Sequence, residues 1–191
     1  YTNITFVDIA GLVKGASKGE GLGNKFLSHI REVDAIIHLV RCFDSDKITH
    51  VNSKINPVDD LETIKTEIIL ADIDVIEKKL DKSKKKLLDD KEIKILEEKL
   101  EQLNQGSEIK TNDEKVNKFL SSLGLLSLKP KIIVCNVDEE SLSKGNSYTE
   151  SVKNKHPNKK VVIICADIED QITDLNNNER EIFMKEIGLN K

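Results

Sequence analysis

Asp8 and Gly11 are the first residues that could do chemistry, three positions apart in the sequence DIAG after an apolar run. A carboxylate at a strand end can hold a magnesium ion, usually through water, and a following glycine lets backbone N–H groups approach a terminal phosphate. The surrounding stretch, Phe6–Phe26, holds five of the nine glycines in the chain. It therefore favours a phosphate-binding loop, although a glycine-rich turn between a strand and a helix explains it equally well.

A second candidate site is Asn136-Val137-Asp138-Glu139, which follows the apolar run KIIVC. Nucleotide-binding sheets carry base-reading residues at the carboxyl ends of their strands. In guanine-binding proteins the motif is NKxD, whose aspartate accepts two hydrogen bonds from the base. Here Val137 stands in place of the lysine and Glu139 in place of the aspartate. Taken alone, a polar turn at a strand end is the simpler explanation.

Cys165 and Ala166 end a third apolar run, VVIIC, where small residues can let the edge of a base meet backbone amides. The order of the three motifs is more informative than any one of them. A strand ending in DxxG, a plain strand, a strand ending in NxxE and a strand ending in a cysteine–alanine pair follow one another in the later two thirds of a GTPase-type core. The chain contains no GxxxxGK[ST] loop, and GEGLGN places Asn24 where a Rossmann fingerprint has its third glycine.

The elements that must position these residues are short apolar strands alternating with helices. Four apolar runs predict strands covered on both faces, as in parallel sheets. Helical spacing predicts a helix after the glycine loop, a short one near the middle and one at the end. This pattern predicts a doubly wound α/β sheet. The predicted strands lie within Ile4–Ala10, Ala35–Phe43, Lys129–Glu140 and Asn158–Asp170, and the helices within Gly23–Asp34, Asp113–Leu123 and Asn176–Gly188.

The middle of the chain predicts a helical insertion into that sheet. Apolar residues recur at spacings of three and four over Asp59–Leu80 and over Leu87–Leu103. Two such helices with charged outer faces predict an antiparallel coiled-coil hairpin. Its turn is rich in lysines, which form a solvated face or could contact RNA phosphates: Lys78, Lys79, Lys82, Lys84, Lys85 and Lys86.

Composition narrows the classes of function. The net charge is −4, so no overall basic field attracts nucleic acid. No apolar stretch approaches the roughly 20 residues of a membrane span. The three cysteines stand far apart in apolar runs, which predicts buried free thiols in a reducing compartment. Tyr1 stands where a complete chain would have methionine, so we expect a fragment.

At this point the sequence is recognisable. VDIAGLVKGASKGEGLGNKFLSHIRE, HLVRCFDSDKITHV, KPKIIVCNVDE and CADIEDQITDLNNNEREIFMKEIGL closely resemble the YchF/Obg-like ATPase family of P-loop NTPases. The resemblance implies a P-loop NTPase-type sheet, mostly parallel, interrupted by the helical hairpin. It implies three segments: 1–57 and 126–191 from the G domain, and 58–125 as the insertion. The first part of the G domain, with the phosphate loop, and the C-terminal TGS domain fall outside this sequence.

The resemblance also implies roles for single residues. Asp8 would support the Mg²⁺ shell and Gly11 would face the γ-phosphate. His50 would orient the attacking water, because Leu12 stands where Ras-like enzymes carry a glutamine; without the resemblance, His50 is an ordinary loop histidine. The base-reading residues would be Asn136, Val137, Glu139, Cys165 and Ala166, with the glutamate admitting adenine.

The function implied is that of an ATP- or GTP-hydrolysing regulator that prefers ATP, uses Mg²⁺ and acts as a cytoplasmic monomer. Its partner would be the ribosome, through rRNA or a ribosomal protein. The fragment alone would be inactive because it lacks the phosphate loop. A different class of function is also open: a non-catalytic scaffold that acts through the coiled-coil hairpin.

Overall fold

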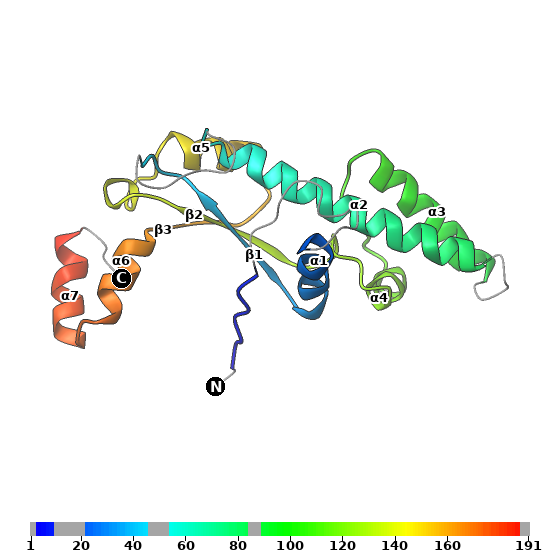
Figure 1. Cartoon of the computed structure of the whole chain (residues 1–191), viewed down its shortest axis with the longest axis horizontal. Helices are drawn as coiled ribbons and strands as arrows, with labels where there is room; N and C mark the ends of the chain where they lie inside the picture. Colours follow the sequence, from blue (N-terminus) through cyan, green and yellow to red (C-terminus); the bar gives the residue numbers. More distant parts are fainter. Residues whose placement is uncertain (1–2, 10–21, 46–53, 84–88, 188–191) are drawn as a thin grey trace. The chain divides into compact units, whose positions relative to one another are not determined.

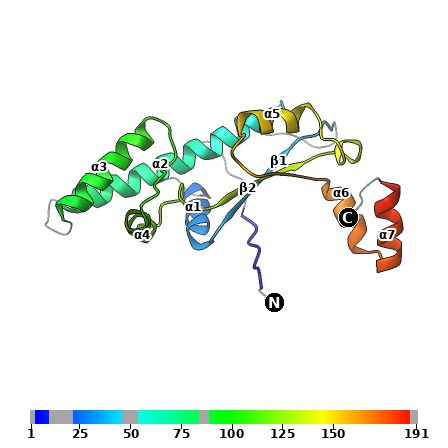
Figure 2. The same ribbon diagram turned by 180° about the vertical axis from the view of Figure 1, so that it is seen from behind.

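The computed structural model describes residues 3–9, 22–45, 54–83 and 89–187 of the 191-residue chain. Figure 1 colours its elements along the sequence, and Figure 2 shows the same ribbon from behind. In chain order these are α1 (Leu22–Glu32), β1 (Ile36–Arg41), α2 (Pro57–Ser83), α3 (Asp90–Asn104), α4 (Glu114–Ser122), β2 (Lys131–Asn136), the 3₁₀ turn η2 (Glu139–Ser141), α5 (Ser147–Lys155), β3 (Val161–Ile164), α6 (Ala166–Thr173) and α7 (Asn177–Glu186).

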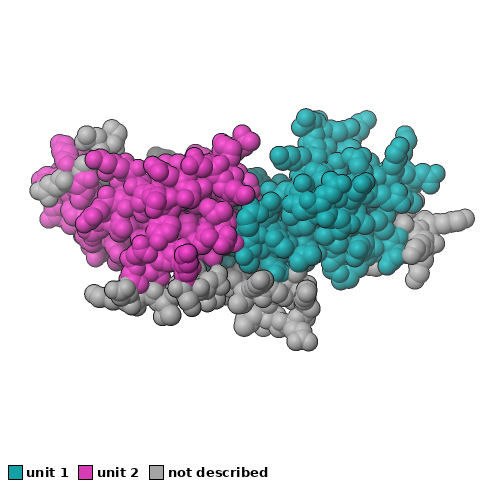
Figure 3. Space-filling view, turned by 90° about the horizontal axis from the view of Figure 1, so that it is seen from above, with its two compact units in different colours: residues 1–36, 62–130 teal, residues 37–61, 131–191 magenta. Residues whose placement is uncertain are grey.

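The chain forms two compact units, coloured separately in Figure 3. Unit 1 comprises residues 1–36 and 62–130, and unit 2 comprises residues 37–61 and 131–191. The chain therefore passes between units within β1, within α2 and just before β2. The predicted segments 1–57, 58–125 and 126–191 describe domains, whereas these two units are defined by contacts between residues. The domain division therefore stays a prediction.

The three strands form one parallel sheet in the order β1-β2-β3. β2 pairs with β3 from Ile133↔Val161 to Asn136↔Ile164. The Cys42 N–H, one residue past β1, donates to the Asn136 carbonyl at 2.7 Å. The carboxyl ends of the strands therefore meet at one edge, and the predicted α/β class is confirmed.

One face of this sheet is packed, and β1 exposes its other face. Buried residues of the packed face include Val40, Ile133 and Cys135, covered by Val152 of α5 and Leu61 of α2. Ile37 and Leu39 on β1 are 51% and 60% exposed. The continuous apolar run predicted a strand covered on both faces, and for β1 this is wrong: exposure alternates along it as in a half-buried strand.

Residues 3–9 do not form the strand that the sequence Ile4–Ala10 predicts. The sheet order gives them no neighbouring strand among the described residues. Ile4 and Phe6 are each 76% exposed. A strand is stable only where its N–H and C=O groups find partners on a neighbour. The apolar residues of this segment predicted a strand, but no described strand pairs with it. The prediction is therefore wrong for the residues described.

Helices α2 and α3 are the two long helices that the middle of the sequence predicts. In Figures 1 and 2, α3 runs back beside the second half of α2. Their apolar stripes meet in one buried cluster with residues of α4 and its flanking loops. The lysines expected at the turn, Lys84–Lys86, lie outside the described residues. Within the described part of the chain, no helix has the length and apolarity needed to cross a bilayer.

Asp72 fastens α2 to the loop that precedes β2. Its carboxylate is fully buried and accepts the backbone N–H of Leu126 at 2.7 Å and of Ser127 at 2.8 Å. In the same loop, the Lys129 ammonium donates to the carbonyl of Arg31, in the last turn of α1, at 3.0 Å, and to the carbonyl of Val33, just after that helix. In unit 1, a few polar side chains therefore form hydrogen bonds with backbone groups that are distant in sequence.

The cysteines agree with the sequence prediction. Cys42, Cys135 and Cys165 are free and buried. The hydrogen bond with the Cys135 thiol, together with burial, raises the pKa of the Cys42 thiol. Cys42 therefore stays protonated at neutral pH and behaves as a core residue of unit 2 rather than as a nucleophile.

Candidate functional site

The carboxyl end of β2 is joined to the start of α6 by a side chain. Asn136, the last residue of β2, accepts the Ala166 backbone N–H through Oδ1 at 2.9 Å. Ala166 is the first residue of α6, and the N-cap residue Cys165 makes no side-chain capping bond. Asn136 therefore supplies, from another strand, an acceptor that the first turn of this helix needs.

The segment that follows Asn136 is held at each step. The Val137 N–H donates to the last carbonyl of β3 at 2.8 Å, and its side chain is 2% exposed. Asp138 caps the turn η2 by accepting the Ser141 N–H at 2.9 Å. Glu139 is the first residue of η2 and is exposed. The loop thus presents Glu139 to solvent while Val137 points into the core.

The predicted site residues of unit 2 do come together around the ends of β2 and β3, but they differ in what they can offer. Glu139 and Ala166 are exposed and Asn136 is half-buried. Val137 and Cys165 belong to buried clusters, so only their backbone atoms can reach a ligand. An amide, a carboxylate and backbone groups at the ends of parallel strands suit the donors and acceptors of a planar heterocycle.

Sequence reasoning missed α5 and the polar network at its start. Asn146 is the N-cap of α5 and forms a capping box with Thr149, whose N–H donates to Asn146 Oδ1 at 3.1 Å. Thr149 is fully buried. The usual capping box has glutamate or glutamine at this position, so a threonine hides the pattern. The only sequence indication was the turn-forming pair Gly145-Asn146.

The segment that leaves β1 is also fixed by residues the sequence did not single out. Tyr148 of α5 donates to the Asp44 carboxylate at 2.9 and 3.2 Å. This hydrogen bond raises the pKa of Tyr148, because the carboxylate favours the protonated phenol. Arg41 donates to the Phe43 carbonyl at 3.0 Å and lies 4.8 Å from the centre of its ring. Further along this segment, His50 lies outside the described residues.

The remaining predicted residues belong to the phosphate side of the site. Asp8 is exposed in a stretch without regular structure, and Gly11 lies outside the described residues. Asp8 is in unit 1 and Asn136 in unit 2, so their predicted position at one sheet edge stays a prediction. No cluster of three or more His, Cys, Asp or Glu in the described ranges could hold a metal alone. One exposed carboxylate nevertheless fits Mg²⁺, which keeps several waters and takes substrate phosphates as ligands.

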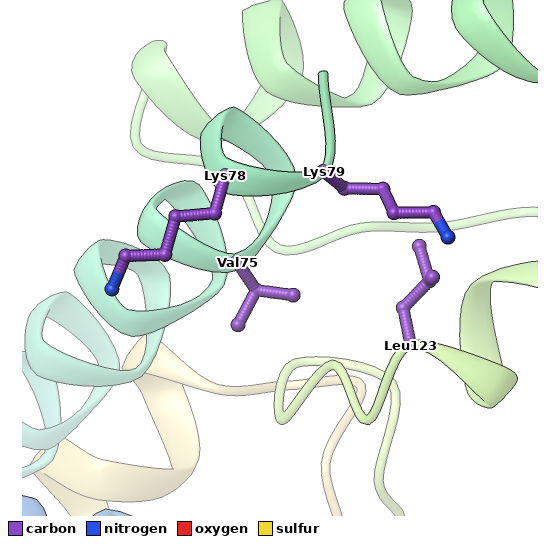
Figure 4. Close-up of a pocket in the computed structure, with 4 residues that line it drawn as sticks. All are labelled: Val75, Lys78, Lys79 and Leu123. Carbon is purple, nitrogen blue, oxygen red and sulfur yellow. The ribbon is translucent and has the colours of Figure 1, made fainter. Parts of the chain in front are cut away.

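A hollow of about 260 Å³ in unit 1 is a weaker candidate. It is lined by Val75, Lys78 and Lys79 of α2 and by Leu123 after α4, and Figure 4 shows the two lysine side chains leaving the helix in opposite directions. The Lys78 ammonium is paired with Asp74 at 2.7 Å. The rest of the lining is apolar, so the hollow lacks the mixed donors and acceptors found at the end of β2.

Comparison with known proteins finds relatives that match almost the whole of this chain. The chain is 41% identical over 200 residues to the "Ribosome-binding ATPase YchF" of Bacillus subtilis, covering 98% of this chain and 54% of that protein. It is 44% identical over 197 residues to the protein of the same name in Escherichia coli O157:H7, with the same coverages. The chain therefore spans about half the length of the curated relatives it matches.

A solved structure and a family description agree with those relatives. The "Structure of the Schizosaccharomyces pombe YchF GTPase" matches with a TM-score of 0.78 and 31% identity, covering 94% of this chain and 52% of that one. Residues 1–72 match the family described as "50S ribosome-binding GTPase". That match includes Asp8, Gly11 and His50.

Proposed function

Because this chain belongs to the YchF family, we propose that the full-length protein is a Mg²⁺-dependent nucleoside triphosphatase that prefers ATP to GTP and acts at the ribosome. The observation that carries the proposal is the bond from the Ala166 N–H to Asn136 Oδ1, with Glu139 exposed on the adjoining turn. This bond fixes the amide of Asn136 at the edge of the sheet where α/β proteins bind nucleotides.

The base would be read by Asn136 and Glu139. Because Asn136 Oδ1 already accepts from Ala166, its Nδ2 is the group that can donate to an acceptor on the base. Glu139 is one methylene longer than the aspartate of NKxD and does not match the paired donors of guanine in the same way, so discrimination in favour of guanine weakens. Val137 and Cys165 would support the site from the core, with only backbone atoms facing the nucleotide.

The phosphates would be handled by residues of the first part of the chain. Asp8 would hold Mg²⁺ through water, and the bound ion would neutralise charge that develops on the γ-phosphate. The backbone at Gly11 would approach that phosphate without hindrance from a side chain. His50 would orient the attacking water or accept its proton near neutral pH, which an imidazole can do.

Ribosome association is proposed because the relatives are named ribosome-binding ATPases and the matching family is described as a ribosome-binding GTPase. A protein that acts there works in the cytoplasm, and we propose that it does so as a monomer. Contact with rRNA or a ribosomal protein through the hairpin lysines remains part of the proposal, although Lys78 is neutralised by Asp74. The alternative, a scaffold that acts only through the hairpin, predicts that ribosome binding survives the loss of nucleotide binding, which co-sedimentation of an Asn136→Ala variant measures.

Base selection is tested by Glu139→Asp in the full-length protein. Aspartate restores the shorter carboxylate of NKxD, and two hydrogen bonds to guanine at about 1 kcal/mol each shift the ATP:GTP affinity ratio roughly tenfold or more toward GTP. Titration with both nucleotides at fixed Mg²⁺ measures the ratio. We do not combine it with Val137→Lys, because that lysine would enter the core beside Val40 and Cys135.

The matched control is Glu140→Asp, the same change on the next residue of η2, which is also exposed. We expect it to leave the ratio unchanged. If both variants leave the ratio unchanged, Glu139 does not read the base. If both move it equally, the effect comes from the general geometry of the turn.

A further inference from the structure

Asn146 does more than cap α5. Its Nδ2 donates to the Cys42 carbonyl at 2.7 Å and lies 3.3 Å from Ser141 Oγ. Cys42 follows β1 and Ser141 ends η2, so one amide group joins the end of a strand to the turn that begins with Glu139. Cys42 is 104 residues away in sequence, which makes this a tertiary contact rather than part of a local turn.

The turn η2 is consequently held from both sides. On its near side, Asp138 Oδ1 accepts the Ser141 N–H at 2.9 Å. On its far side, the Gly145 N–H donates to the Ser141 carbonyl at 2.7 Å, and Asn146 contacts the Ser141 hydroxyl. The side chain of Glu139 is exposed, so packing does not fix its position. Its place relative to Asn136 therefore depends on where Ser141 is held.

Only an amide side chain can perform both tasks of residue 146. Oδ1 must accept the Thr149 N–H, at 3.1 Å, to cap the helix, while Nδ2 must donate to the Cys42 carbonyl. Aspartate caps a helix as well as asparagine does, but at neutral pH it has no donor. Serine has an O–H donor, but its shorter side chain carries a single oxygen, which cannot take the separate positions of Oδ1 and Nδ2. Helix capping alone would not require asparagine.

We propose that Asn146 is a positioning residue for base selection, holding the turn that carries Glu139 against the end of β1. The proposal rests on the proposed function, in which Glu139 reads the base. Asn146 itself contacts no nucleotide in this proposal. It acts through the Cys42 carbonyl and Ser141, and its loss lets Glu139 leave the position from which it discriminates one base from another.

The test is Asn146→Asp in the full-length protein, with affinities for ATP and GTP measured at fixed Mg²⁺. The cap survives, the donor is lost and a carboxylate faces the Cys42 carbonyl. We expect the ATP:GTP affinity ratio to fall toward one by about fivefold to tenfold, the loss of one well-placed hydrogen bond and the repulsion that replaces it. The ratio isolates the base, because both nucleotides carry the same phosphates and feel the new charge equally.

A KM-against-kcat comparison separates positioning from general damage. Because the chemistry is at the phosphates, KM for ATP should rise while kcat stays within about twofold. The matched control is Asn176→Asp. Asn176 caps α7 with a capping box and accepts from Asn178 and Glu179, all within its own helix. This control should change neither the ratio nor KM.

Ser141→Ala provides a second variant if Asn146→Asp folds poorly. It removes only the hydroxyl that Asn146 contacts and leaves both the cap and the bond to Cys42, so a smaller shift in the same direction is expected. If Asn146→Asp and Ser141→Ala both keep the parent ratio while Glu139→Asp changes it, the positioning role is wrong and the base-reading role stands. If none of the three changes it, Glu139 does not read the base and both ideas are wrong.

Discussion

Asp72 in unit 1 and Asn136 in unit 2 do the same thing in different surroundings. Each accepts a hydrogen bond from the backbone of a segment far along the chain: Asp72 from Leu126 and Ser127, and Asn136 from Ala166. Asp72 is fully buried, whereas Asn136 is half-buried at an open sheet edge. Where the surroundings are closed, such a bond serves only the fold; where they are open, it also fixes a side chain at the edge where we propose that the nucleotide binds.

The largest expected effect is a loss of stability when the buried residue of this pair, Asp72, is changed. Asp72→Ala leaves two buried N–H groups without acceptors, and each such loss costs about 1–3 kcal/mol, so the free energy of unfolding should fall by roughly 3 kcal/mol. Urea denaturation measures it. The control is Asp74→Ala on the same helix, which breaks only an exposed pair with Lys78 and should cost less than about 1 kcal/mol. Equal losses would mean that burial is not what distinguishes these carboxylates.

Two glycines with similar backbone angles give the next largest effect. Gly145 has φ of +75°, and a Cβ there would lie 2.5 Å from Thr149 Oγ1 and 3.3 Å from Ile163 Cδ1. Gly124 in unit 1 has φ of +71° with no atom within 4 Å of that position. The left-handed angle alone costs a residue with a side chain about 1–2 kcal/mol. We expect Gly124→Ala to lose that amount and Gly145→Ala to lose clearly more.

Thermal unfolding of the two glycine variants measures the difference. The added clash at Gly145 displaces the Thr149 hydroxyl, which accepts the Asn146 N–H at 2.8 Å. Gly145→Ala should therefore also weaken base selection, while Gly124→Ala leaves it unchanged. If the two variants lose the same stability, the network at the start of α5 is not tightly packed, and the comparison between open and closed regions weakens.

The smallest effect concerns the bond between Tyr148 and Asp44, which lies at the surface of unit 2. The folded protein raises the pKa of Tyr148, so it holds the phenol proton more tightly than the unfolded chain does. Stability from this bond is fully present below the ordinary tyrosine pKa of about 10 and is lost as pH rises above it. In Tyr148→Phe this alkaline loss should disappear, which denaturation at pH 8 and pH 11 measures. An unchanged alkaline loss would assign it to other groups.

Much of the fold could be predicted because its helices and strands show regular patterns of apolar residues. Helices α2 and α3 follow from apolar residues at spacings of three and four, and the ends of β2 and β3 follow from apolar runs that stop at polar residues. Helix α5 could not be predicted in this way. Its buried residues are Thr149 and Val152, too few for a periodic pattern.

The residues of the candidate site likewise divide into those that the sequence could predict and those that it could not. Asn136 and Glu139 could be proposed from their position after a strand and from the family resemblance. Asn146 could not, because its role depends on the Cys42 carbonyl, 104 residues away, and on a hydroxyl in a turn that no pattern predicts. The absence of the predicted strand from residues 4–9, the described part of Ile4–Ala10, has a related cause. Its sequence is suited to pairing, but pairing depends on a partner that the sequence itself does not specify.

The bonds of Asp72 also impose an order on the synthesis of the chain. Its partners, Leu126 and Ser127, are made 54 and 55 residues after it. At translation rates of about 5–20 residues per second, this is an interval of roughly 3–11 s. Until then the carboxylate lacks these two backbone donors, although α3, which packs beside α2, is complete 32 residues after Asp72. Unit 1 therefore cannot bury this carboxylate with both of its hydrogen bonds until its last segment, which ends at residue 130, has been made.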